Sequence, residues 1–245
     1  MEFQPGDIVN PGFGIANDIV TVAVEEGFVH ELTLTVEQGL FGGAPAKGED
    51  AGAGRNYAAM IDQPYQFDFY DGGGLDIAFL SFAQVDSDGN VNVSRFGDAI
   101  GGPGGFINIR QGTCRVVFLG TLTAKGFTAE LDGNGGIRIE REGRVRKWVP
   151  RVEQITFNGS YALQQGRQIS FITDRAVFEL TQRGLVCTEL ARGMDFQRDL
   201  QSQIEFEVIE AKEIREIEPR IYRNGPMNIL ATFNARGPRS RRRGK

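Results

Sequence analysis

The sequence is poor in the residues that hold metals and disulfides. It contains two widely separated cysteines, Cys114 and Cys187, and a single histidine, His30. Because structural metal sites need clustered Cys and His ligands, this composition argues against a bound metal. Two thiols without a C-x-x-C spacing predict buried, reduced cysteines of a cytoplasmic protein.

Long apolar runs are also missing. No stretch approaches the roughly 18–20 consecutive apolar residues of a membrane-spanning helix. Residues 1–6 contain neither the basic nor the apolar region of a secretory signal. We therefore expect a cytoplasmic protein that does not enter a membrane. Its 245 residues, 40% of them hydrophobic, are enough to form a sizeable core.

The charges are unevenly distributed along the chain. Its 27 basic and 32 acidic residues give a net charge of −5, but six of the basic residues lie in the last ten. Residues 1–235 therefore carry 21 basic against 32 acidic groups, a net charge of −11, which argues against a nucleic-acid partner. We interpret residues 1–235 as one domain. Residues 236–245 are expected to be a disordered tail, although such a tail could also bind polyanions.

The most informative stretch is residues 31–48, ELTLTVEQGLFGGAPAKG. Its first half alternates as a strand does, with leucine and valine on one face and Thr33, Thr35 and Glu37 on the other. A glycine-rich turn follows, and missing Cβ atoms there would let a bulky ligand approach both the backbone and the Glu37 carboxylate. Glu37 is therefore a candidate for chemistry at the end of a strand. The alternative is a solvated carboxylate beside a glycine turn.

Residues 7–27 predict a strand, a glycine turn and a helix. The strand covers residues 7–10, and the helix covers residues 15–26 with Gly27 as its stop signal. A strand that runs through G-x-G into a helix is also typical of dinucleotide-binding proteins. That signal is weak here, because Asn17 stands where the third glycine is expected.

A second glycine cluster lies at residues 101–106. Glycine turns of this kind can direct several backbone N–H groups at one point, which is what an oxyanion hole requires. The cluster is not a phosphate-binding P-loop, because no G-K-[ST] follows it. A purely structural turn remains the alternative.

The remaining pattern predicts an α/β fold, built on a mixed open sheet with flanking helices and β-hairpins. Residues 49–66 predict a long polar surface loop, residues 75–85 a buried strand and residues 86–90 a hairpin turn. Asp195 is expected to cap a helix at residues 196–204. Strands at residues 127–131 and 137–140 are expected to pair as a hairpin across the D-G-N-G-G turn at 132–136. Further strands are predicted at residues 114–122, 154–157, 169–173, 176–180 and 185–190.

The pattern E-x-G-x-x-G-G at Glu37 resembles the active-site motif of the class I coenzyme A transferases of the acetate/propionate or 3-oxoacid type. FDFYDGGGLDIAFL (residues 67–80) is similar to the acetate/propionate branch. GGPGGFINI (residues 101–109) resembles the glycine pair before a hydrophobic residue in the related transferases, and the resemblance extends over residues 5–227. It implies the NagB/RpiA-type fold of that family. Where the family often reads N-x-G-I-G-I-P, this chain has NPGFGIA, which departs from that motif at Pro11 and Ala16.

The resemblance also assigns roles to residues. It implies that Glu37 is the nucleophile and that the backbone amides of Gly104 and Gly105 form the oxyanion hole. It implies contacts to coenzyme A from Asn10, Gly12, Gly14, Gly39, Gly42 and Gly43.

The family builds its site from two related halves, and this chain is similar to the glutamate-bearing half. The resemblance therefore implies an α-type partner, either as a separate subunit of a hetero-oligomer or as part of a longer parent. It implies ping-pong transfer of coenzyme A between an acyl-CoA and a short-chain carboxylic acid, through a glutamyl-CoA thioester. Coenzyme A is then a substrate, with no tightly bound cofactor. A thioester hydrolase on the same scaffold and a non-catalytic CoA-binding subunit remain as alternatives.

Overall fold

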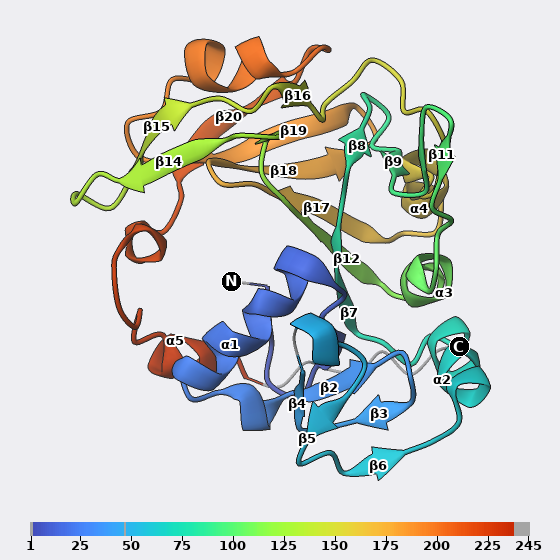
Figure 1. The fold of residues 1–245 in the computed structure, drawn as a ribbon. Helices are drawn as coiled ribbons and strands as arrows, with labels where there is room; N and C mark the ends of the chain where they lie inside the picture. The colour runs from blue at the N-terminus through green and yellow to red at the C-terminus, as the bar shows by residue number, and fades with distance from the viewer. Residues whose placement is uncertain (1, 47, 238–245) are drawn as a thin grey trace. The chain divides into compact units, whose positions relative to one another are not determined.

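The computed structural model describes residues 2–46 and 48–237. The contacts divide the chain into two compact units (Figure 1). Unit 1 comprises Met1–Leu80, Asn108–Arg115 and Pro226–Lys245, and unit 2 comprises Ser81–Ile107 and Val116–Gly225. The single domain at residues 1–235 stays a prediction. Most of the expected tail, residues 238–245, lies outside the described residues.

Unit 1 is built on a mixed sheet with strand order β7-β1-β2-β3-β6. Its central strand β1 is parallel to both neighbours, β2 and β7, whereas β3 is antiparallel to β2 and to β6. The strands are β1 (Ile8–Asn10), β2 (Thr33–Val36), β3 (Leu40–Phe41), β6 (Ala59–Met60) and β7 (Ile77–Ser81). A short antiparallel ribbon of β4 (Ala44–Pro45) and β5 (Gly54–Arg55) adjoins them.

The helices of unit 1 follow directly from local sequence signals. The 3-10 helix η1 (Gly14–Asn17) runs into α1 (Asp18–Glu25), and Gly27 follows with φ of +80°. Helix α2 (Gln63–Asp71) has a proline in its first turn, where the missing N–H costs nothing. Other short helices are η2 (Val29–Glu31), η3 (Gly48–Asp50) and α5 (Leu230–Asn234), while α3 (Phe106–Gln111) begins in unit 2 and ends in unit 1.

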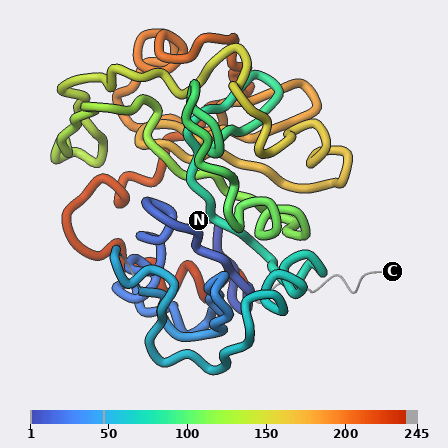
Figure 2. Tube along the Cα trace, turned by 45° about the vertical axis from the view of Figure 1, so that its right-hand side comes forward, coloured from blue at the N-terminus to red at the C-terminus, as the bar shows by residue number. Residues whose placement is uncertain are grey.

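The C-terminal segment of unit 1 is fastened to the end of α1 (Figures 1 and 2). The buried Glu26 carboxylate accepts hydrogen bonds from the backbone N–H groups of Met227 and Ile229. Next to this contact, the rings of Phe28 and Phe233 stack with centroids 4.4 Å apart. Residues more than 200 positions apart in the chain therefore share one core.

Unit 2 contains a second mixed set of strands, in the order β12-β17-β18-β19-β20. Strands β17, β18 and β19 are antiparallel, and β20 is parallel to β19. Trp148 packs against Phe171 and Phe178, with centroids 5.7 and 4.5 Å apart, and forms the centre of the core. The strands are β12 (Arg115–Leu119), β17 (Gln168–Ile172), β18 (Ala176–Thr181), β19 (Gly184–Leu190) and β20 (Ile209–Glu216).

Short hairpins and helices complete unit 2. The paired strands are β8 (Gln84–Val85) with β9 (Val91–Asn92), β10 (Arg95–Phe96) with β11 (Ala99–Ile100), β13 (Thr123–Ala124) with β16 (Val145–Arg146), and β14 (Thr128–Leu131) with β15 (Ile137–Arg141). The helices are α4 (Gly159–Gln164), the π-helix η4 (Phe196–Leu200), and the 3-10 helices η5 (Gln201–Gln203) and η6 (Pro219–Tyr222).

The α/β class with a mixed sheet, the predicted strand at 7–10 and both hairpins are confirmed. Asp195 also caps a helix, since its side chain accepts from the Arg198 N–H at 2.7 Å. Within the described residues, no helix combines the length and the apolarity that crossing a bilayer requires.

Several local predictions were wrong. Residues 154–157 form no strand beyond an isolated bridge at Phe157, and residues 75–85 contain two strands separated by a break. The expected loop at 49–66 contains β5, β6 and the start of α2. Cys114 is exposed, whereas Cys187 is buried as predicted. Strands as short as β5 and β6 depend on pairing with neighbouring strands, which a local pattern does not record.

Candidate active site

Glu37 is the first residue after β2 and begins the turn that leads into β3. Because β1 and β2 are parallel, the loop that follows β1 leaves the sheet at the same edge. The chain passes from β1 through α1 to β2, and β7 lies on the other side of β1. The strand order therefore reverses at β1, and ligands of open α/β sheets bind beyond the carboxyl ends of strands at such a point.

The Glu37 carboxylate is half-buried and unengaged. Among the described residues it has neither a hydrogen-bond partner nor an ion-pair partner. Burial raises its pKa above the ordinary value of 4.5, since removal from water disfavours the charged form. A carboxylate that no cation or donor stabilises keeps its oxygen lone pairs available for attack on a ligand.

A pocket of unit 1 opens onto this carboxylate. Three of the residues singled out in the sequence, Asn10, Gly12 and Glu37, line it together. The Asn10 Oδ1 accepts from the Gly12 backbone N–H at 2.9 Å, which fixes the loop after β1. The other lining residues are Pro11, Phe13, Asn17, Thr35, Val36, Pro45, Ala46 and Gly52.

The other predicted glycines of unit 1 do not line this pocket. Gly39 and Gly43 have positive φ, and a Cβ atom on them would lie 1.9 Å from the Ile61 carbonyl oxygen and 2.1 Å from the Arg55 carbonyl oxygen. Glycine is required at both positions because another backbone segment passes there. Gly42 lies in the same turn, and Gly14 begins η1. Their contact with coenzyme A stays a prediction.

A buried hydrogen-bond chain lies behind Glu37, and the sequence patterns did not reveal it. The Asn10 Nδ2 donates to the Tyr70 hydroxyl at 3.1 Å, which donates to the Thr35 Oγ1 at 3.0 Å. The Thr35 hydroxyl in turn donates to the Val9 carbonyl oxygen at 2.9 Å. Tyr70 is fully buried, and burial raises its pKa, with the Glu37 charge as a smaller contribution. These hydrogen bonds therefore fix β1, β2 and α2 to one another beside the Glu37 carboxylate.

Asn17 also lines the pocket, and the family resemblance assigns no role to it. It lies at the end of η1 and is only 7% exposed. Its Nδ2 donates to the Ala46 carbonyl oxygen at 3.1 Å, while its Oδ1 is buried without a hydrogen-bond partner among the described residues. The sequence drew attention to this position only as a missing third glycine.

Gly104 and Gly105 belong to unit 2, in the loop that precedes α3. Gly104 is exposed with φ of +53°, and a Cβ atom on it would meet no atom within 4 Å. Among the described residues, neither amide N–H has an acceptor. Unengaged amides are what an oxyanion hole requires, and their role stays a prediction.

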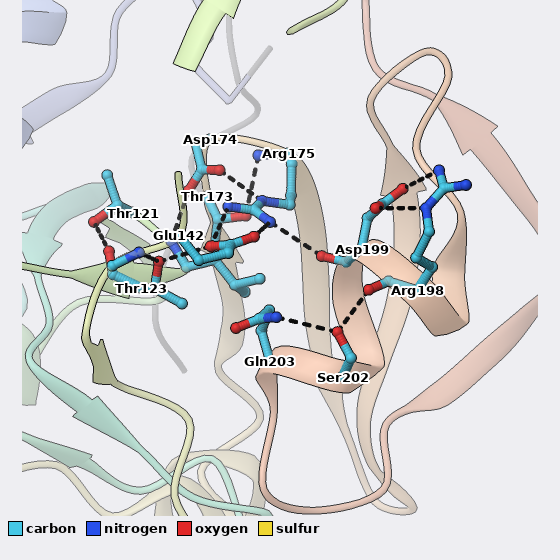
Figure 3. A network of polar contacts seen from close by, with 12 residues as sticks. Thr121, Thr123, Glu142, Thr173, Asp174, Arg175, Arg198, Asp199, Ser202 and Gln203 are labelled. Carbon is cyan, nitrogen blue, oxygen red and sulfur yellow. Dashed lines mark hydrogen bonds and ion pairs between the residues drawn. The ribbon is translucent and has the colours of Figure 1, made fainter. Parts of the chain in front are cut away.

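Unit 2 also contains a dense polar cluster around the fully buried Arg175 (Figure 3). Its guanidinium pairs with Glu142 and with Asp174, the latter at 2.7 Å, and donates to the Asp199 carbonyl oxygen at 3.1 Å. Thr123 donates to the same Glu142 carboxylate at 2.9 Å. Because these charges are engaged with one another, we interpret the cluster as a structural cross-link between hairpins.

Comparison with known proteins finds similarity to coenzyme A transferases. No family model matches it. It is 42% identical over 227 residues to a caffeate CoA-transferase of Acetobacterium woodii, covering 91% of this chain and 43% of that protein. It is 41% identical over 229 residues to the acetate CoA-transferase YdiF of Escherichia coli K12, covering 94% of this chain and 43% of that protein. The chain thus spans less than half the length of these curated relatives.

Solved structures agree with the sequence comparison. The acyl-CoA transferase YdiF from E. coli O157:H7, solved as a thioester complex with CoA, matches with a TM-score of 0.88 and 39% identity, over 98% of this chain and 44% of that one. Glutaconate coenzyme A-transferase from Acidaminococcus fermentans matches with a TM-score of 0.66 over 97% of this chain and 90% of that one, but at 14% identity, which shows the fold alone. With 41–42% identity across nine-tenths of its length and the same fold, this chain is similar to coenzyme A transferases over a little less than half the length of these curated relatives.

Proposed function

We propose that this chain is the glutamate-bearing half of a coenzyme A transferase, with Glu37 as the covalent nucleophile. The observation that carries the proposal is the unengaged, half-buried Glu37 carboxylate in a pocket beyond the carboxyl ends of parallel strands. The relatives support the same chemistry, since two are named as CoA-transferases for acetate and caffeate. A thioester complex with CoA was solved for YdiF from E. coli O157:H7.

The reaction divides one acyl exchange into two symmetrical halves. The Glu37 carboxylate attacks the carbonyl carbon of an acyl-CoA, forming an acyl-glutamyl anhydride and expelling the CoA thiolate. The thiolate then attacks the glutamyl carbonyl carbon, releasing the first acid as a carboxylate and leaving a glutamyl-CoA thioester. An incoming short-chain carboxylate reverses both steps and leaves as a new acyl-CoA. Coenzyme A is a substrate throughout, and the steps involve no oxidant or proton donor.

The environment of Glu37 suits the first step. Burial removes water from the carboxylate, so less solvation must be lost when it attacks. Each tetrahedral intermediate carries a negative oxygen, and we assign its stabilisation to the unengaged amides of Gly104 and Gly105. An oxyanion-hole donor typically contributes about 2.7–4 kcal/mol. Asn10 and Gly12, which share the pocket with Glu37, are the proposed contacts to the coenzyme.

The chain acts together with an α-type half. Its relatives are more than twice as long as the matched segment, which supports a larger functional protein or a hetero-oligomer. We propose that this half contributes to the coenzyme and acid sites. The assembly is cytoplasmic, because acyl-CoA is an intracellular substrate.

Trapping the intermediate tests the nucleophile. Incubating the native assembly with acyl-CoA but no acceptor acid should attach coenzyme A to Glu37, and borohydride or hydroxylamine treatment followed by peptide mass spectrometry locates the modification. Glu37→Gln should abolish exchange while leaving the fold intact, since the carboxylate makes no hydrogen bond or ion pair with a described residue. Glu31→Gln, at an exposed carboxylate before β2, is the matched control.

The outcomes separate the competing functions. Parallel initial-rate lines with varied acyl-CoA and acid indicate the ping-pong transferase. Rapid CoA release without an acceptor acid indicates a thioester hydrolase. An active assembly that carries the label on another residue, or no label at all, contradicts the assignment of Glu37.

A further inference from the structure

The Asn17 side chain has a fixed orientation in the pocket. Its Nδ2 donates to the Ala46 carbonyl oxygen at 3.1 Å. The reversed amide would place two acceptor oxygens against each other, so this contact determines which end is the oxygen. The Oδ1 therefore points away from Ala46, and it is buried without a partner among the described residues.

A buried acceptor without a donor costs free energy, which a ligand N–H or O–H group would recover. The neighbouring polar side chains of the pocket are already engaged. Asn10 accepts from Gly12 and donates to Tyr70, and Thr35 bonds to both Tyr70 and Val9. Asn17 is the neutral side chain that leaves an acceptor to a ligand beside Glu37.

The chemistry of the ligand identifies the donor, on the basis of the function proposed above. The thioester of an acyl-CoA has a sulfur and a carbonyl oxygen but no donor, and an ionised carboxylic acid has none either. The first N–H group along coenzyme A is the cysteamine amide, two methylene groups from the sulfur. A thioester positioned for attack by Glu37 would have this amide in the same pocket, where Asn17 leaves an acceptor.

We infer that the Asn17 Oδ1 accepts a hydrogen bond from the cysteamine amide N–H of coenzyme A. This contact persists in acyl-CoA and in the glutamyl-CoA thioester, because the amide lies outside the bonds that break. It also holds the thiolate near the acyl-glutamyl anhydride between the two attacks. Asn17 is thus a coenzyme-binding residue, and it favours thiols with an amide at this position.

A pair of substrates isolates this hydrogen bond. The first is an acyl-pantetheine, and the second is its analogue with the cysteamine amide replaced by an ester, which has no N–H. The native assembly should use the amide about 10-fold better in kcat/KM, the loss expected when a buried hydrogen bond is removed. Asn17→Leu should remove this preference, because leucine has no oxygen that could accept the amide N–H.

The ratio between the substrates distinguishes binding from a structural role. A structural defect lowers kcat/KM for both substrates equally and leaves the preference intact, which would overturn the inference. Equal use of amide and ester by the unmodified assembly would overturn it as well, even if Asn17→Leu failed to fold. Failure of the proposed function is recognised separately, because the unmodified assembly would then transfer no acyl group and Glu37 would carry no label.

Discussion

Removing the Tyr70 hydroxyl group should test the hydrogen-bond chain behind Glu37. Tyr70→Phe keeps the ring of a fully buried residue of α2 and deletes one oxygen. That oxygen accepts from the Asn10 Nδ2 at 3.1 Å and donates to the Thr35 Oγ1 at 3.0 Å. The substitution therefore breaks two hydrogen bonds inside unit 1 without creating a large cavity.

The magnitude follows from what each partner loses. Thr35 still donates to the Val9 carbonyl oxygen, so its hydroxyl remains engaged. The Asn10 Nδ2, in a residue that is itself buried, loses its acceptor. Leaving a buried donor unpaired costs about 1–3 kcal/mol, so we expect the free energy of unfolding to fall by about that amount.

Urea unfolding followed by circular dichroism measures this loss, and the same helix provides the control. Tyr65 is 64% exposed on α2, so Tyr65→Phe should change the free energy of unfolding by less than about 0.5 kcal/mol. If Tyr70→Phe proves as neutral as Tyr65→Phe, the hydrogen-bond chain does not stabilise the region beside Glu37, and the reasoning is refuted.

Two pH dependences follow from buried charges. Burial raises the pKa of Glu37, so a pH profile of kcat/KM should show an acid limb above pH 4.5, where protonation removes the nucleophile; a limb at or below the ordinary value contradicts this. Burial lowers the pKa of Lys147 from 10.5 to about 8, although its Nζ lies 3.7 Å from the Phe82 ring centroid. Between pH of about 8 and 10.5, the Lys147 amine is protonated in the unfolded chain but has lost its proton in the folded chain. The free energy of unfolding should therefore rise with pH over this range. Lys147→Met should abolish that rise in urea titrations, and an unchanged slope would refute the assignment.

The sequence predicted secondary structure best where a segment shows a local alternation or a turn motif. The alternation in residues 32–36 and the D-G-N-G-G turn at 132–136 predicted a strand and a hairpin that both exist. The alternation nevertheless misled about exposure, since Thr35 lies on the polar face and is fully buried. Its hydroxyl is satisfied by Val9 and Tyr70, residues 26 and 35 positions away, and no local pattern reports such partners.

The sequence of helix α2 contains two signals that favour a helix, although a loop was expected up to residue 66. Pro64 stands in its first turn, and Gln66 and Tyr70, four positions apart, are both fully buried. These are a helix start signal and a helical spacing. The surrounding glycines and polar residues favoured a loop instead. Asn17 could not have been found in this way, because its unpaired oxygen depends on the position of the Ala46 carbonyl group 29 residues away.

Two glycines of the E-x-G-x-x-G-G motif make room for the packing of another backbone segment. At Gly39 and Gly43 the missing Cβ atoms leave space for the backbone at Ile61 and Arg55, while the approach of a ligand to this turn stays a prediction. That close approach allows residues 44–46 and 48–61 to fold back against β2 and β3, and Ala46 and Gly52 of these segments line the pocket. Ala46 then holds Asn17 by its amide nitrogen. The motif therefore supplies the carboxylate and also the backbone packing that builds the pocket around it.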